Sequence, residues 1–166
     1  MIHNGTFEDG PEVSTFFTTT HGETDYLLSY PEESTRDDEK QSNYLKETTE
    51  SDREIELLAI VDGKIVGMAG FHAIGSKYKV RHRAEFGITV SKDYWGQGIG
   101  KALMNACIEC AKEAGYIQLE LDVVADNTRA IELYKKLGFI EFGRNPKGFQ
   151  SKYSGFQELV YMRLEL

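Results

Sequence analysis

The sequence predicts an α/β domain in which a mixed central β-sheet is flanked by helices. Strand-like segments with alternating or continuous apolar residues are interspersed with helical segments, in which apolar residues recur every three or four positions. Such intermixing is typical of helices packed on the faces of one sheet. The 166 residues contain no repeat, low-complexity tract or linker. We therefore expect a single domain over residues 1–166.

The composition is that of a soluble, folded protein, with 40% hydrophobic and 28% charged residues. No apolar run approaches the roughly 18 residues of a membrane helix, and residues 1–5 do not resemble a secretory signal. Two cysteines are too few for a disulfide framework, so we expect a cytoplasmic protein without membrane contact. The net charge of −8 argues against nucleic acid as a partner, because phosphate backbones attract basic surfaces.

Charge is unevenly divided along the chain. Residues 1–56 contain 15 Asp and Glu against four Lys and Arg, whereas residues 57–166 contain 12 acidic and 15 basic residues. The first part therefore suits a cationic ligand and the second part an anionic one. A solvated acidic helix beside a neutral domain explains the same asymmetry, so the charge supports a ligand only together with a motif.

Four helices are expected, and each has a start or stop signal. Pro11 marks the first turn of the first helix, and the breaker Pro31 precedes an exposed, polar second helix. Gly115 caps the C-terminus of the amphipathic third helix, Asn127 caps the N-terminus of the fourth, and Gly138 ends it. The helices are expected from residue 9 onward, over 35–50, over 99–115 and over 127–137.

Six strands are expected from their apolar patterns. The first two form a hairpin, because Asp62-Gly63 between them readily adopts the positive φ angles of a two-residue turn. The third ends in a glycine-rich turn at residues 96–100, and an aromatic-rich loop separates the last two. The expected strands are residues 55–61, 65–71, 84–90, 117–123, 139–142 and 159–164.

Three further patterns are given structural interpretations. Cys107 and Cys110 lie in the middle of a helix, where nothing lowers the pKa of a thiol, so we expect packing groups and no redox or zinc site. The four histidines lack metal-ligand spacing, so no metal is expected. Alternating basic residues predict a solvated strand edge that discourages sheet pairing: Lys77, Lys79, Arg81 and Arg83.

The most informative segment is the glycine turn, Gly96-Gln97-Gly98-Ile99-Gly100, where a strand ends and an amphipathic helix begins. Glycines let the backbone approach a ligand, the first turn of a helix binds phosphate, and Lys101 adds a positive charge. A P-loop is excluded because Ala102 replaces its Ser or Thr, and a dinucleotide fingerprint because Lys101 replaces its third glycine. A strand-to-helix connection without a ligand is the structural alternative.

Two separate motifs resemble the acetyl-coenzyme A (acetyl-CoA) signature of the GNAT N-acetyltransferase superfamily. The first is Trp95-Gly96-Gln97-Gly98-Ile99-Gly100, and the second is Asn127-x-x-Ala130-x-x-x-Tyr134-x-x-x-Gly138-Phe139. The turn of the family is commonly Gln/Arg-x-x-Gly-x-Gly/Ala, so Trp95 departs from it at the leading position. The likeness covers residues 55–142 well and implies a GNAT-like domain that binds acetyl-CoA.

The resemblance also implies roles for individual residues. Tyr134 would protonate the departing thiolate, Asn127 would contact the pantetheine arm or a phosphate, and Glu85 would act as the base, often through water. The backbone of Ile88 and Val90 would pair with the pantetheine amides. The residues expected to contact acetyl-CoA are Ile88, Val90, Gln97, Gly98, Gly100, Lys101, Ala102, Asn127 and Ala130.

Two of these roles have structural alternatives. Tyr134 lies on an apolar helix face, where a half-buried core aromatic is the ordinary outcome. Glu85 alternates with the apolar residues of its strand and is expected to be partly desolvated, which would raise its pKa. A surface ion pair with Arg81 or Arg83 is the other interpretation of Glu85.

The resemblance implies an enzyme that transfers an acetyl group from acetyl-CoA to the primary amine of a small cationic molecule or peptide, and a homodimer. A non-catalytic acyl-CoA sensor of the same fold is the first alternative, and a nucleotide-binding enzyme of another fold is the second. By the same likeness, residues 1–54 form acceptor-side helices, residues 55–142 the acetyl-CoA-binding core, and residues 143–166 closing strands.

Overall fold

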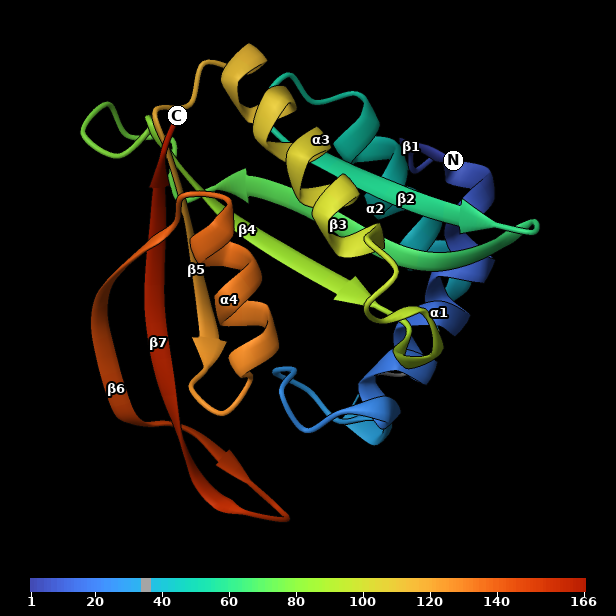
Figure 1. Ribbon diagram of the computed structural model, residues 1–166. Coiled ribbons are helices and arrows are strands. Elements are labelled where there is room, and N and C mark those ends of the chain that lie inside the picture. The colour runs from blue at the N-terminus through green and yellow to red at the C-terminus, as the bar shows by residue number, and fades with distance from the viewer. Residues whose placement is uncertain (34–36) are drawn as a thin grey trace.

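The computed structural model describes residues 1–33 and 37–166, which form one mixed seven-stranded sheet with helices on both faces (Figure 1). The strand order is β1-β2-β3-β4-β5-β7-β6, and β4 and β5 are the parallel pair. The strands are β1 Ile2–Asn4, β2 Ile55–Val61, β3 Lys64–Ala73, β4 Arg83–Val90, β5 Gln118–Val124, β6 Ile140–Ser151 and β7 Gly155–Glu165. The α-helices are α1 Gly10–Glu23, α2 Asp38–Thr49, α3 Ile99–Glu113 and α4 Thr128–Lys136. This confirms the predicted α/β class.

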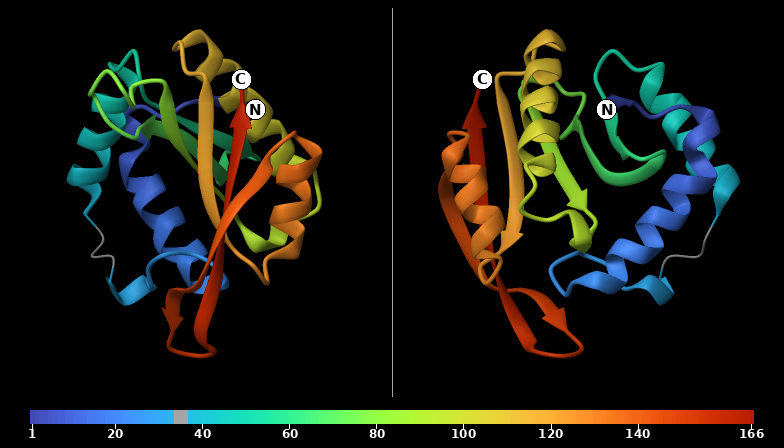
Figure 2. Two further views of the ribbon diagram at one scale, coloured as in Figure 1. Left: turned by 90° about the vertical axis from the view of Figure 1, so that its left-hand side faces the viewer. Right: turned by 45° about the vertical axis from the view of Figure 1, so that its right-hand side comes forward.

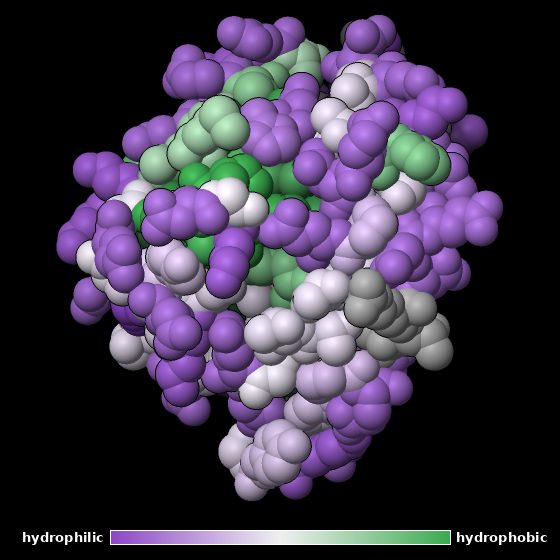
Figure 3. Space-filling model, turned by 90° about the vertical axis from the view of Figure 1, so that its right-hand side faces the viewer, coloured by the Kyte–Doolittle hydropathy of each residue, from purple (hydrophilic) through white to green (hydrophobic). Residues whose placement is uncertain are grey.

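Two hydrophobic cores lie on opposite faces of the sheet. Consecutive residues of β2 point in opposite directions, so Leu57 belongs to the larger core with α3 and α4, and Leu58 to the smaller core with α1 and α2. Figure 2 shows these two helix pairs on the two sides of the strands. The face drawn in Figure 3 is mainly hydrophilic, with most of its hydrophobic residues in its upper half. The sheet is thus the shared wall between two cores.

The local signals in the sequence place several elements correctly. Asp62 and Gly63 adopt positive φ angles of 49° and 75° in the turn between β2 and β3. Asn127 accepts the backbone N–H of Ala130 at the start of α4. The expected second helix is present as α2, which begins at Asp38, where the side chain of Asp37 accepts the Lys40 N–H. Residues 35 and 36 lie outside the described part of the chain.

Two predictions about the strands are wrong. Lys77, Lys79 and Arg81 lie in a turned segment before β4, and β4 itself is an inner strand between β3 and β5, so these residues form no strand edge. The expected aromatic loop after residue 142 is instead a long hairpin of β6 and β7. Strand β6 lies at the sheet edge, where Pro146 is tolerated, and two register shifts interrupt its side-chain alternation.

The feature that positions the site is the divergence of β4 and β5. Within the described chain these strands pair only from Arg83–Glu85 to Gln118–Glu120. Beyond Glu85, β4 stays paired with β3 up to Val90, whereas β5 stays paired with β7 up to Val124. Figure 1 shows the two strands spreading apart below their contact. The C-terminal half of β4 therefore has one edge without a strand partner.

The paired glycines of β3 and β4 provide a matched stability test. A Cβ at Gly70 would lie 2.2 Å from the Ile55 carbonyl oxygen, whereas a Cβ at Gly87, its cross-strand partner, would meet no described atom within 4 Å. We expect Gly70→Ala to lower the free energy of unfolding by about 1–3 kcal/mol. Gly87→Ala should leave it unchanged or raise it by up to about 1 kcal/mol. Urea denaturation of both variants checks this, and equal losses would contradict it.

Candidate active site

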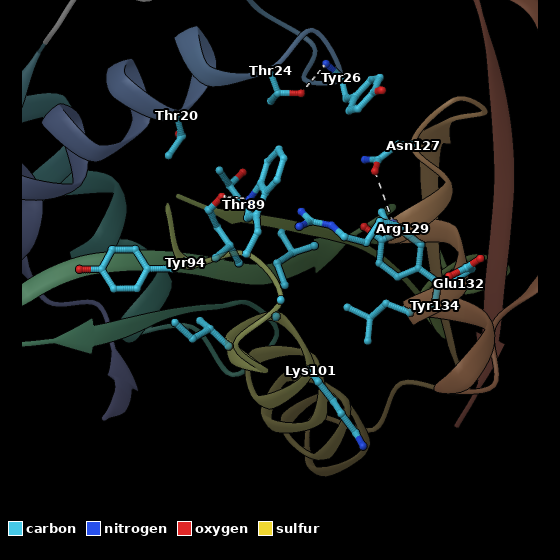
Figure 4. A pocket seen from close by; sticks show the side chains of 18 of the residues that line it. Thr20, Thr24, Tyr26, Thr89, Tyr94, Lys101, Asn127, Arg129, Glu132 and Tyr134 are labelled. Carbon is cyan, nitrogen blue, oxygen red and sulfur yellow. Dashed lines mark hydrogen bonds between the residues drawn. The ribbon is translucent and has the colours of Figure 1, made fainter. Parts of the chain in front are cut away.

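A pocket of about 480 Å³ lies beside the open edge of β4 (Figure 4). Its walls come from the end of α1 and the loop after it, the end of β4, the glycine turn and α4. Tyr134 and most of the residues predicted to bind acetyl-CoA line it: Ile88, Val90, Gly98, Gly100, Lys101, Asn127 and Ala130. Among the described residues, Gln97, Ala102 and Glu85 are outside this wall. Two motifs far apart in sequence thus meet around one cavity.

The glycine turn presents bare backbone to the pocket. Gly96 and Gly98 have φ angles of 75° and 84°, a region that favours glycine. Gly98 is the N-cap of α3 and has no side chain with which to cap the first N–H groups of the helix. A Cβ at Gly98 would meet no atom of the described chain within 4 Å, so the space beside it is open. These N–H groups and the positive end of the helix dipole suit an anion.

The open edge of β4 presents a second set of backbone groups. The Ser91 N–H donates to the Val66 carbonyl at 2.9 Å, and hydrogen bonding alternates along an antiparallel pair. Ile88 and Val90 therefore direct their N–H and C=O groups away from β3 and toward the gap. The Val90 carbonyl already accepts the indole Nε1–H of Trp95 at 2.7 Å. Trp95 thus ties the glycine turn to the end of β4.

Arg129 is a pocket residue that sequence analysis missed. Its guanidinium Cζ lies 3.9 Å from the ring centroid of Trp95, so the side chain crosses from the first turn of α4 to the glycine turn. With Lys101 and Lys136 it gives the α3 and α4 side of the pocket three cations, accompanied there by the acidic Glu132. In the sequence, only its position two residues after Asn127 indicated that Arg129 could belong to the site. Its contact with Trp95 depends on tertiary structure.

Tyr134 is both a buried core aromatic and a residue of the pocket wall. Its side chain is buried, with 8% of its surface exposed, and packs 5.9 Å from Phe139 between ring centroids. It also lines the pocket. Burial, and secondarily the negative charge of Asp122, raises the pKa of the phenol above its ordinary value of 10. The hydroxyl therefore stays protonated at neutral pH and is available as a proton donor.

Glu85 is in a different setting from the one expected. Its side chain is 52% exposed and pairs with His72 Nε2 at 3.2 Å, so the predicted partial desolvation is not found. The predicted ion pair with Arg81 or Arg83 is wrong as well, because Arg83 pairs with Glu120 across the β4–β5 contact. Its role as a base stays a prediction.

The wall opposite α4 comes from the N-terminal part of the chain, as Figure 4 shows for Thr20, Thr24 and Tyr26. Leu27 and Glu23 belong to the same wall, and one carboxylate oxygen of Glu23 accepts the Lys92 N–H at 2.9 Å. This wall is therefore made of hydroxyl groups, one apolar side chain and one fixed carboxylate. The sequence predicted only that this part of the protein is acidic, and it did not show which of its residues line the pocket.

Other candidate chemistry lies away from the pocket. Cys107 is buried, which raises the pKa of its thiol, and Cys110 is half-buried with its pKa raised by the same cause. In residues 1–33 and 37–166, no group of three or more His, Cys, Asp or Glu side chains could hold a metal ion. The helices of this described part are too short or too polar to span a membrane.

Comparison with known proteins agrees with this arrangement. The family model described as "Acetyltransferase (GNAT) family" matches residues 20–139, which include the glycine turn and α4. The chain belongs to the GNAT family. It is 32% identical over 108 residues to "L-amino acid N-acetyltransferase AaaT" from Escherichia coli K12, covering 64% of this chain and 65% of that protein. It spans less than two thirds of the length of the first curated GNAT relatives that it matches.

Two solved structures extend the likeness to the whole GNAT domain. An acetyltransferase of the GNAT family from Streptococcus pneumoniae matches with a TM-score of 0.95 and 29% identity, covering 100% of this chain and 99% of that one. The fold of yncA from Salmonella typhimurium, a putative acetyltransferase with its cofactor acetyl-CoA, matches with a TM-score of 0.86 at 20% identity, over 100% of this chain and 93% of that chain. The β6–β7 hairpin and α1 are therefore part of the shared fold.

Two glycines that flank α3 allow a matched test of the GNAT turn. Gly98 and Gly115 both have positive φ, and at neither would a Cβ meet a described atom within 4 Å, but only Gly98 lines the pocket. We expect Gly98→Leu to raise the Kd for acetyl-CoA on the order of 100-fold, because the side chain enters the space beside the helix N–H groups. Gly115→Leu should bear similar strain and keep the parent Kd. Isothermal titration calorimetry checks both, and equal Kd values would contradict the assignment.

Proposed function

We propose that the protein transfers an acetyl group from acetyl-CoA to a primary amine of a small cationic molecule or peptide. The observation that carries this proposal is the division of charge across one pocket. Lys101, Arg129 and Lys136 outnumber Glu132 on the α3 and α4 side, whereas Glu23 lies on the opposite wall. An anionic diphosphate and a cationic amine thus find complementary ends of the same cavity.

The donor end fits acetyl-CoA by its backbone chemistry. The space beside Gly98 leaves the first N–H groups of α3 accessible to phosphate oxygens. The open edge of β4 offers the Ile88 backbone and the Val90 N–H to amide groups of an extended arm, as a strand partner would. Trp95 already occupies the Val90 carbonyl, so pairing there is limited to the donor side. The presence of acetyl-CoA in the yncA structure supports this assignment.

The chemistry asks for three proton transfers. A lysine-like amine with a pKa of about 10.4 must lose a proton before it attacks the thioester carbonyl. The nitrogen of the tetrahedral intermediate then loses a second proton, the C–S bond breaks, the neutral amide forms and the thiolate of CoA leaves, to be protonated in the third transfer. Tyr134 supplies a proton to that thiolate in this proposal, since its phenol is neutral and faces the pocket. General acid and base groups each contribute about 10²- to 10⁴-fold to such a rate.

The mechanism also needs a base, for which the GNAT resemblance implies Glu85. Glu85 is exposed, paired with His72 and outside the pocket wall, so it would have to act through water. This observation also favours the second candidate function, a non-catalytic acyl-CoA sensor that keeps the donor end without turnover. The cytoplasmic location and the homodimeric state stay predictions.

Turnover with a panel of amines separates the two functions. The panel contains spermidine, kanamycin, the proteinogenic L-amino acids and a lysine-containing peptide, and L-amino acids belong in it because AaaT is named for them. We expect thiol release from acetyl-CoA with at least one amine, and a product heavier by one acetyl group in mass spectrometry. Binding of acetyl-CoA without thiol release above hydrolysis for any amine would favour the sensor.

Replacement of the proposed acid tests the mechanism. We expect Tyr134→Phe to lower kcat by about 100-fold or more, because the thiolate then leaves without a positioned proton. The Kd for acetyl-CoA should stay within about twofold, since the ring and its packing remain. Between pH 7 and 9 the parent should not lose activity through Tyr134, because burial raises the pKa of the phenol above 10. An unchanged kcat in the variant would remove Tyr134 from the mechanism.

A further inference from the structure

Two segments distant in sequence meet beside the pocket: the loop after α1, residues 24–30, and the end of the β6–β7 hairpin, residues 151–157. Figures 1 and 2 show the hairpin projecting beyond the sheet and passing close to this loop. The contact is polar and centres on Asp25. The Ser151 Oγ–H donates to Asp25 Oδ2 at 2.5 Å, and Gln157 Nε2–H donates to the Asp25 carbonyl at 3.0 Å.

Burial shields these hydrogen bonds from water. Ser151 and Gln157 are among the buried polar residues of the described chain, with 7% and 8% of their surfaces exposed. Water therefore competes little for their hydrogen-bonding groups. The other carboxylate oxygen of Asp25 accepts the Tyr30 hydroxyl at 3.2 Å, so the Asp25 carboxylate joins Ser151 to Tyr30, while its main-chain carbonyl holds Gln157.

A second set of contacts links Tyr30 to the hairpin turn. The Lys152 N–H donates to the Tyr30 hydroxyl oxygen at 2.8 Å, and the Tyr30 and Tyr153 rings lie edge to face, 5.8 Å between centroids. The Lys152 ammonium lies 4.4 Å from the centroid of the Tyr30 ring and pairs with Glu32. We call the contact between residues 24–33 and 151–157 the loop latch.

The latched loop is also part of the pocket wall. Thr24 and Tyr26, the two neighbours of Asp25, line the pocket together with Leu27. The Tyr26 N–H donates to Thr24 Oγ1 at 3.2 Å, so the segment has a defined local turn. Neither hydrophobic core of the described chain contains a residue of this loop, and Leu28 is 81% exposed. The loop is thus held at the pocket mainly by the latch.

We propose that Asp25 is a positioning residue that, through the loop latch, fixes Thr24, Tyr26 and Leu27 against the pocket and so sets the affinity for the amine acceptor. This inference rests on the proposed function for the identity of the acceptor end. Asp25 itself does not line the pocket, and both of its carboxylate oxygens are engaged in the latch. The donor end does not depend on it, because the glycine turn, β4 and α4 form no part of the latch.

The test has one readout that needs no acceptor. Hydrogen–deuterium exchange of the peptide covering residues 24–30 should become about tenfold faster or more in Asp25→Ala and in Ser151→Ala, because the loop loses its main anchor. The Kd for acetyl-CoA should stay at the parent value in both. Glu158→Gln is the matched control, since it breaks the ion pair with Arg144 on the same hairpin but touches no residue of the loop.

The second readout uses the amine panel. For L-amino acids, spermidine and kanamycin, the KM of any amine that turns over should rise about tenfold in Asp25→Ala, while kcat falls by less than about twofold. Unchanged exchange at residues 24–30, or an equal loss of acetyl-CoA affinity, would overturn the latch. A fall in kcat at constant KM would overturn its role in acceptor binding. If no amine turns over in the parent protein, the proposed function fails, and the exchange result still decides the latch.

Discussion

The divergence of two parallel strands is the constraint on which the rest of the molecule depends. Each strand is held on its other side, β4 by β3 as far as Val90 and β5 by β7 as far as Val124. Beyond Glu85 the two strands do not pair with each other, so the backbone groups that face the gap stay available, apart from the Val90 carbonyl that Trp95 occupies. The pocket, the glycine turn and α4 are all arranged around that gap. The topology of the sheet thus determines where the site lies, and the side chains complete it.

The two ends of the pocket consist of different kinds of groups, main-chain groups at one end and side chains at the other. The proposed donor end consists of main-chain groups of α3 and β4, reinforced by Trp95, whose indole bonds to Val90 and whose ring contacts Arg129. Replacing most side chains there leaves the backbone N–H groups in place. The proposed acceptor end consists of side chains such as Glu23 and Tyr26 on α1 and its loop. Its shape depends on contacts made at a distance.

This difference explains what the sequence could predict. Positive φ at Asp62 and Gly98 and the cap at Asn127 are local requirements, and local residue types meet them, so the hairpin, the turn and the cap were all found. The pairing of Glu85 with His72 depends on the register of β3 and β4, which no short window contains. The start of β6 was predicted, but its continuation beyond residue 142 was missed, because register shifts interrupt the alternation by which a strand is recognised.

The same difference bears on how specificity can change in such a fold. A substitution at Gly98 alters the conformation of the donor turn itself, because φ is positive there. In the proposed latch, a substitution at Ser151 or Gln157 alters only how firmly the loop is held, since these residues contact Asp25 and do not line the pocket. The acceptor end can therefore vary while the donor end is retained. A local glycine motif then predicts the donor, and the acceptor has to be found from long-range polar contacts that only the folded chain contains.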